Sequence, residues 1–268
     1  MLRSMYSGIS GLRNFQTKLD VIGNNISNVN TYGFKKGRTI FKDLISQTVA
    51  GSSGPMESGA RGGVNAKQVG LGSQIAAIDT IHTGGSTQFT GNTLDLAIAG
   101  DGFFKVGEDG GDNAFYTRAG NFYMDQAGDL VDGEGRYVLD IDDNKINIPL
   151  TATSMSIGQD GSVKYVLPDE DEVQGDAQIS ITKFSNPGGL EKVGGNLFQI
   201  SANSGPASTG GPLDEGRGKI ESGFLEMSNV DLAEEFTEMI VAQRGFQANT
   251  RIITTSDEIL QELVNLKR

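Results

Sequence analysis

Residues 229–268 read NVDLAEEFTEMIVAQRGFQANTRIITTSDEILQELVNLKR, and this segment carries the clearest helical pattern of the chain. Apolar residues recur along it at every seventh position, at Leu232, Met239, Phe246, Ile253 and Leu260. Ser228 or Asn229 is suited to cap a helix here, and acidic residues follow in the first turn, where the helix dipole favours negative charge. The pattern predicts a helix over 229–268, about 60 Å long at the usual rise per residue.

The companion positions of this seven-residue repeat are polar, at Gln243, Thr250 and Asp257. A two-stranded coiled coil requires apolar residues at both seam positions of each repeat. We therefore expect a helix that meets several neighbouring helices, none of them along a continuous apolar seam.

The N-terminal segment carries a similar apolar stripe, and its spacing predicts a helix over 1–30 with one narrow apolar face. Gly8, Gly11 and Gly23 each weaken such a helix by about 1 kcal/mol relative to Ala. We therefore expect this helix to form only when it is packed against another element. The stripe consists of Leu2, Met5, Ile9, Leu12, Phe15, Leu19, Ile22, Ile26 and Val29.

Between the two helical segments, short apolar or alternating runs predict β-strands. Asp-Gly dipeptides and other turn residues separate these runs, which is the pattern of an antiparallel barrel or sandwich. The predicted strands are Ala76–Ile81, Leu94–Ala99, Phe103–Val106, Gly120–Met124, Arg136–Ile141, Ser162–Val166 and Gln178–Phe184.

These segments together predict an α+β fold in four parts. The helices at 1–30 and 229–268 are expected to pair as a coiled-coil-like domain. Residues 31–70 are predicted to be an extended connector, flexible in the stretch Ala50–Gly63, which is rich in Gly and Ser. Residues 71–228 are predicted to form the central antiparallel β domain.

The formal net charge of −12 is unevenly distributed along the chain. Residues 1–50 carry seven Lys/Arg against two acidic residues, whereas residues 101–176 carry seventeen acidic residues against five Lys/Arg. Nucleic-acid binding requires a basic surface, so we predict no nucleic-acid partner.

No apolar run approaches the roughly 20 residues that span a bilayer. The first ten residues lack a charged region followed by an apolar one. We therefore expect no cleaved secretion signal.

Few residues could supply catalysis or bind a metal. The chain has no Cys and a single His, and a lone loop residue such as His82 lacks the orienting partner of a catalytic base. Gly100-Asp101-Gly102 precedes a predicted strand, which favours a hairpin turn over a phosphate loop. The acidic stretch Asp125–Glu134 breaks the spacing of a calcium loop. We predict no catalytic residue, cofactor, metal ion or small-molecule substrate.

Two other classes of protein remain alternatives at this point. A secreted β module that binds glycans or calcium would account for the acidic, turn-rich middle of the chain, but it leaves the long terminal helices without a role. An enzyme would require a cluster of reactive residues, which one His and no Cys make hard to build.

Three sequence motifs stand out, one near each end of the chain and one in its centre. They are DVIGNNISNVNTYGFK at 20–35, GFF at 102–104 with YTRAGNF at 116–122, and SNVDL at 228–232 with QRGFQAN at 243–249. With these motifs the chain resembles the axial proteins of the bacterial flagellum, the rod and hook family, over its whole length.

Within that family the motifs are most similar to those of the hook protein, in a short form. NVDL at 229–232, RGFQAN at 244–249 and LVNLK at 263–267 carry this similarity. Many hook proteins are much longer, however, and 268 residues is near the length of the distal rod protein. The distal rod protein is therefore the alternative.

The resemblance implies a structural subunit and no enzymatic activity. It implies paired terminal helices that line an inner tube, a β domain that forms the outer tube, and assembly into a helical homopolymer. The hook is a flexible universal joint that transmits motor torque to the filament, whereas the distal rod is a rigid drive shaft of the basal body.

The resemblance also implies where the protein works and what it binds. It implies a place in the basal body or hook, outside the cell, after export without a cleaved signal peptide. The implied partners are further copies of the chain, the neighbouring rod, hook-cap and hook–filament junction proteins, and the flagellar type III export apparatus.

Residues that contact other subunits are expected on both terminal helices. The predicted assembly residues are Leu2, Met5, Ile9, Leu12, Phe15, Leu19, Ile22, Asn24, Asn25, Ile26, Leu232, Phe236, Met239, Phe246, Asn249, Ile253, Leu260 and Leu263.

Overall fold

A computed structural model of the chain divides into two compact units. It describes residues 2–54, 62–111, 113–168, 173–175 and 177–266. The first, which we call the helical unit, comprises Met1–Ile26, Gly37–Asp79 and Asp231–Arg268. The second, which we call the β unit, comprises Ser27–Lys36 and Thr80–Val230. The predicted connector 31–70 thus has residues in both units.

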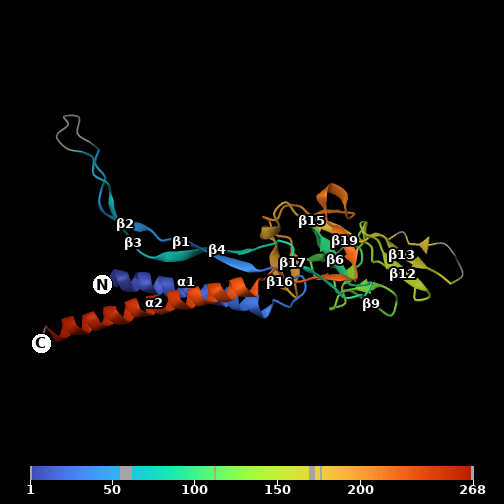
Figure 1. Cartoon of the computed structure of the whole chain (residues 1–268). Helices are drawn as coiled ribbons and strands as arrows, with labels where there is room; N and C mark the ends of the chain where they lie inside the picture. Colours follow the sequence, from blue (N-terminus) through green and yellow to red (C-terminus); the bar gives the residue numbers. More distant parts are fainter. Residues whose placement is uncertain (1, 55–61, 112, 169–172, 176, 267–268) are drawn as a thin grey trace. The chain divides into compact units, whose positions relative to one another are not determined.

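Two long helices, α1 (Leu2–Ser27) and α2 (Leu232–Asn265), provide most of the helical unit (Figure 1). Both lie within the ranges that the apolar stripes predicted. With antiparallel strands between them in sequence, the chain has the α+β fold that was predicted.

Asp231 caps the N-terminus of α2. Its carboxylate accepts hydrogen bonds from the backbone N–H groups of Ala233 at 2.8 Å and Glu234 at 3.3 Å. The predicted cap at Ser228 or Asn229 is therefore wrong. The motif SNVDL offers three capping residues, and the last of them occupies the position where its carboxylate reaches the free N–H groups.

Two two-stranded sheets complete the helical unit (Figure 1). They pair β1 (Gly37–Asp43) with β4 (Ser73–Thr80) and β2 (Ser46–Ala50) with β3 (Lys67–Gly70). Beyond β2 and β3, Ser53 and Val64 exchange backbone hydrogen bonds of 3.0 and 2.9 Å. The flexible loop predicted at Ala50–Gly63 is therefore corrected at its start, where Ala50 ends β2 and Ser53 pairs with Val64. Residues 55–61 of that stretch lie outside the described part of the chain.

A nine-stranded antiparallel sheet forms the centre of the β unit. In its central strand, Phe104 pairs with Thr117 on one side and with Ile181 on the other, and every residue of the strand is buried. The strands are β16 (Glu191–Gly194), β17 (Leu197–Gln199), β8 (Phe115–Thr117), β7 (Phe103–Gly107), β11 (Tyr137–Val138), β10 (Leu130–Val131) and β9 (Tyr123–Met124), with β15 (Ile181–Lys183) and β18 (Ser208–Gly210) beside them.

Three smaller sheets surround this one within the β unit. They consist of β12 (Ser154–Ile157), β13 (Val163–Val166) and β14 (Val173–Gln174); of β6 (Leu96–Ala99) and β19 (Lys219–Ser222); and of β5 (Thr87–Phe89) and β20 (Phe224–Glu226). Two short 3-10 helices, η1 (Pro187–Gly189) and η2 (Asp214–Gly216), lie in the connections.

Apolar side chains of the β unit form two buried clusters, of which the smaller consists of Phe103, Tyr116, Phe184, Leu190 and Phe198. The larger cluster contains Phe104 and Phe122, with their ring centroids 5.2 Å apart in an edge-to-face arrangement. The other buried members are Leu96, Ile98, Val106, Leu130, Val138, Ile146, Ile148, Ile157, Val163, Ile179, Ile181, Leu197 and Ile220.

The whole net charge of the chain belongs to the β unit. That unit contains eleven Lys/Arg and twenty-three Asp/Glu, whereas the helical unit contains eleven of each. The helical unit is therefore formally neutral, and the β unit carries the charge of −12.

Candidate functional site

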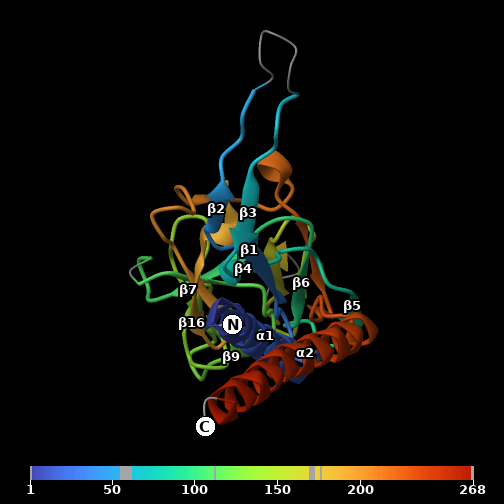
Figure 2. The same ribbon diagram turned by 90° about the vertical axis from the view of Figure 1, so that its left-hand side faces the viewer.

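The candidate functional site begins with the contact between α1 and α2, which run antiparallel in the helical unit (Figures 1 and 2). Glycines lie at this contact. An added Cβ at Gly11 would lie 2.9 Å from the Asn249 side chain, and one at Gly245 would lie 2.5 Å from the Phe15 ring. The glycines that weaken each helix by itself therefore allow the two backbones to approach closely.

Polar side chains bind the same two helices to each other. Lys18 of α1 forms an ion pair with Glu238 of α2. The amide of Asn25, which is buried, donates to Glu235 Oε2 at 3.1 Å and to the Gly37 carbonyl at 2.9 Å, and accepts from the Gly37 N–H at 2.9 Å. Asn25 thus joins α1, α2 and the start of β1.

Two stripes of α2 differ in chemistry and in exposure. The buried or half-buried stripe mixes polar and apolar residues, namely Glu235, Met239, Ala242, Asn249, Ile253, Ser256 and Leu260. A second, exposed stripe, which we call the outer stripe, is apolar and consists of Val241, Ile252, Ile259, Leu263 and Leu266. The predicted seven-residue stripe divides between the two environments, because Leu232 and Phe246 are exposed.

The predicted assembly residues occupy three environments. Ile22 and Asn25 are buried. Met5, Leu12, Phe15, Leu19, Ile26, Met239, Asn249, Ile253 and Leu260 are half-buried, whereas Ile9, Asn24, Leu232, Phe236, Phe246 and Leu263 are exposed. Leu2 lies in α1, and its side chain is outside the described part of the chain.

A second arrangement, which we call the charge cluster, lies in the β unit and consists of Lys35, Arg118 and Glu226. All three are at most 3% exposed. Glu226 accepts from Lys35 Nζ at 2.6 Å, from Arg118 Nη1 at 3.2 Å and from the Gly85 N–H at 2.9 Å. Lys35 also donates to the Thr83 carbonyl at 2.8 Å. Burial lowers the pKa of the Lys35 ammonium because desolvation disfavours its charge.

The charge cluster is where the three sequence motifs meet. Lys35 ends the first motif, Arg118 belongs to the second, and Glu226 lies two residues before the third. Gly33, at a φ of +67°, donates its N–H to the Glu226 carbonyl at 2.8 Å, and a Cβ there would collide with the Ala119 backbone. No apolar pattern in the sequence marks these three charged residues as a site; the signal available was a charge inside or beside each motif.

His82 lies beside the charge cluster. Its ring packs edge-on against those of Phe103 and Phe198, with centroid distances of 5.5 and 5.3 Å. Among the described residues, neither ring nitrogen has a hydrogen-bond partner. Burial, and secondarily nearby cations such as Lys35, lowers the pKa of His82 to about 4.

We expect acid to destabilise the β unit through His82. Its pKa is 6.5 when unperturbed and about 4 in the fold, so the unfolded chain binds the proton more readily between these values. The contribution to stability is complete above pH 6.5 and falls by about 3 kcal/mol as the pH drops through 4. Thermal unfolding of the wild type and of His82→Phe, compared from pH 7 to pH 4, measures this. Equal losses in both proteins would contradict it.

Asp129, the buried acid of the stretch Asp125–Glu134, is held by protein partners. Asn147 Nδ2 donates to it at 2.7 Å and Lys145 Nζ at 2.9 Å, and these hydrogen bonds hold the pKa of its carboxyl below the ordinary range. Within the described ranges, no group of three His, Asp or Glu side chains is placed to hold a metal ion.

Comparison with known proteins connects the motifs to a family. Models described as the flagellar hook protein FlgE/F/G D1 domain, the flagellar basal body rod FlgEFG protein C-terminal and the flagella basal body rod protein match residues 97–165, 221–266 and 5–35. The flagellar basal-body rod protein FlgG of Bacillus subtilis is 62% identical over 270 residues, with all of both chains covered. This chain belongs to the flagellar rod and hook family.

Two further members of the rod and hook family differ in their sequence identity to this chain. The basal-body rod protein FlgG of Borreliella burgdorferi is 41% identical over 270 residues, and the hook protein FlgE of the same organism is 33% identical over 445 residues. Both alignments cover all of each chain. The family that the motifs predicted is therefore confirmed, whereas the similarity to the hook protein is the weaker one.

The matched segments of the rod and hook family contain the charge cluster. Lys35 lies in the segment 5–35, Arg118 in 97–165 and Glu226 in 221–266, so that each of the three matches contributes one charged residue. The family is one of structural flagellar components. In the described part of the chain, no helix has both the length and the hydropathy to cross a membrane.

Proposed function

We propose that this chain is a subunit of the distal rod, the rigid drive shaft of the flagellar basal body, and that it is not an enzyme. The observation that carries the proposal is the identity of 62% with a flagellar basal-body rod protein over the full length of both chains. It replaces the hook interpretation, because the hook relative is 33% identical and its alignment extends over 445 positions, against 268 residues here.

The subunit polymerises with further copies through its helical unit. The outer stripe supports this, because burying one large apolar side chain contributes about 1.5–3 kcal/mol to association. Exposed Tyr6 and Ile9 add apolar surface on α1. A contact between different surfaces of identical copies does not close, so it generates a helical polymer.

This role places the protein outside the cell, in the basal body. Its neighbours would be the axial proteins that precede and follow it, with the hook components on one side, and the flagellar type III export apparatus would deliver it. The glycines at the contact of α1 and α2 support export in an unfolded state, because helices that form only when packed against a partner remain unfolded without one.

We expect Val241→Asp to block polymerisation while the isolated subunit keeps its fold. Val241 belongs to the outer stripe and is 54% exposed, so the substitution should cost the monomer little stability. Burying an unpaired carboxylate between copies costs several kcal/mol. Sedimentation of polymers and swimming of the mutant strain measure the effect.

Gln247→Asp is the matched control for that substitution. Gln247 is also exposed on α2 but lies outside the outer stripe, so the same new charge should leave polymerisation unchanged. If both variants polymerise equally well, or both fail, the outer stripe is not the interface.

The shape of the wild-type polymer distinguishes the rod from the hook. A rod subunit is expected to give straight polymers in electron micrographs, both after assembly in vitro and in basal bodies isolated from cells. Curved or supercoiled polymers would contradict the proposed rod subunit and would support the hook interpretation.

A further inference from the structure

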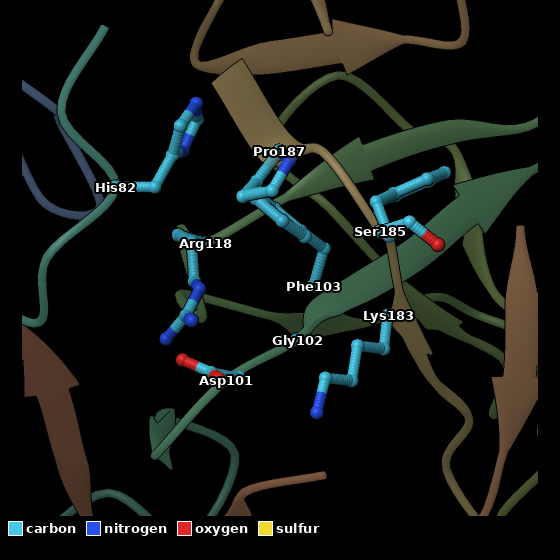
Figure 3. A pocket seen from close by; sticks show the side chains of 9 residues that line it. His82, Asp101, Gly102, Phe103, Arg118, Lys183, Ser185 and Pro187 are labelled. Atoms are coloured by element: carbon cyan, nitrogen blue, oxygen red, sulfur yellow. The ribbon is translucent and has the colours of Figure 1, made fainter. Parts of the chain in front are cut away.

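A cavity of about 220 Å³ opens next to the charge cluster within the β unit (Figure 3). Arg118 of the cluster and His82 line it on one side, and Lys183, from the end of β15, lies on the other (Figure 3). The remaining residues are Asp101, Gly102, Phe103, Phe184, Ser185 and Pro187.

The surroundings of this cavity are positively charged, in a unit whose net charge is −12. In the charge cluster two cations share the single carboxylate of Glu226, which leaves one positive charge without compensation. Lys183 adds another at the lining, and Asp101 supplies the one acidic side chain there. Lys192, which donates to the Lys35 carbonyl at 3.1 Å, adds a further cation close by.

Several buried polar atoms at the cavity have no hydrogen-bond partner among the described residues. Arg118 is 3% exposed, and its Nε–H has no partner among the described residues, although Nη2 donates to the Gly100 carbonyl at 2.8 Å. Both ring nitrogens of His82 are in the same situation. Buried polar groups are ordinarily paired, so the Arg118 Nε–H and the single N–H of the neutral His82 ring indicate a missing acceptor.

We propose that this cavity receives the carboxylate of an acidic side chain from a second copy of the chain. An acceptor with negative charge would satisfy Arg118 and compensate the excess positive charge at once. The β unit itself supplies the complementary group, because its acidic residues outnumber its basic ones by more than two to one. The inference rests on the proposed polymer for the source of the carboxylate, but the cavity can be tested in the monomer.

Acetate is the probe for the monomer, at constant ionic strength with chloride as the control anion. His82 is the single histidine of the chain, so its ring resonances in NMR spectra report directly on the cavity. Acetate should shift them saturably in the wild type. Lys183→Gln should weaken acetate binding about threefold or more, and Asp101→Asn should strengthen it by a similar factor, since each changes one charge at the lining.

The control is Lys164→Gln, which removes an exposed lysine of β13 outside the cavity and should leave acetate binding unchanged. Shifts that do not saturate, or that chloride reproduces, would show that the cavity holds only solvent and would overturn the proposal. Equal effects of Lys183→Gln and Lys164→Gln would also overturn it.

Polymerisation identifies the source of the carboxylate. Lys183→Gln should raise the lowest protein concentration that supports polymers by about threefold or more, and Lys164→Gln should not. If the cavity binds acetate but Lys183→Gln has no effect on polymerisation, the site belongs to a free anion and a carboxylate from a second copy is excluded. A wild-type chain that binds acetate but never polymerises would contradict the proposed rod, while the carboxylate site would stand.

Discussion

Glu226→Gln should lower the free energy of unfolding of the β unit by about 3–5 kcal/mol. The substitution leaves Lys35 and Arg118 buried without a counter-charge, and both are at most 3% exposed. Denaturant unfolding followed by tyrosine fluorescence and far-ultraviolet circular dichroism measures the loss. Because the three sequence motifs meet at Glu226, we also expect the variant to fail in swimming assays.

Glu221→Gln is the control for this substitution. Glu221 pairs with Lys219 at 2.8 Å, but the two side chains are 26% and 38% exposed, so the change should cost about 1 kcal/mol or less. Adding Lys35→Met to Glu226→Gln should recover part of the loss, since it removes one of the unpaired cations. A Glu226 variant as stable as the Glu221 variant would contradict the proposed importance of the charge cluster.

Gly245→Leu should separate α1 from α2. The first side-chain carbon would lie 2.5 Å from the Phe15 ring, which packs at 5.9 Å against the ring of Phe41 and has little freedom to move away. Overpacking of this kind costs about 1–3 kcal/mol, enough to melt helices that depend on packing. We expect a loss of helical signal at 222 nm in the monomer, and no polymer.

Gly23→Leu tests whether the effect comes from the contact. Gly23 also lies inside a long helix, but an added Cβ there meets nothing within 4 Å, so a better helix former should stabilise α1 by about 0.5–1 kcal/mol. Phe15→Ala combined with Gly245→Leu should restore pairing by opening the space. If Gly23→Leu and Gly245→Leu melt the helices alike, close approach at Gly245 is not what holds the pair.

Apolar patterns predicted the parts of the fold that have a buried face or are buried throughout. The apolar stripes placed both helices, and apolar runs placed strands such as β7, whose residues are all buried. The strands β2 and β3 could not be found in this way, because every one of their residues is exposed and no alternation marks them. The stretch Ala50–Gly63 was therefore interpreted from its Gly and Ser content alone.

The charge cluster depends on contacts that no local pattern contains. Lys35 and Glu226 are 191 residues apart in sequence, and Arg118 and Glu226 are 108 residues apart. The motifs around them were recognised, but a buried ion pair can be predicted only when it is known which segments of the chain come together in the fold. The buried or half-buried stripe of α2 was predicted in part. Glu235, Ala242 and Ser256 were missed, because polar or small side chains do not mark an apolar stripe.

The uneven distribution of charge makes the assembled polymer a polyelectrolyte. Each added copy contributes a net charge of −12 from its β unit and a net charge of zero from its helical unit. Such a filament gathers a layer of counterions, so its growth is favoured by salt that screens repulsion between subunits. The same layer keeps separate filaments from bundling side by side, and multivalent cations that bridge anionic surfaces are expected to draw them together.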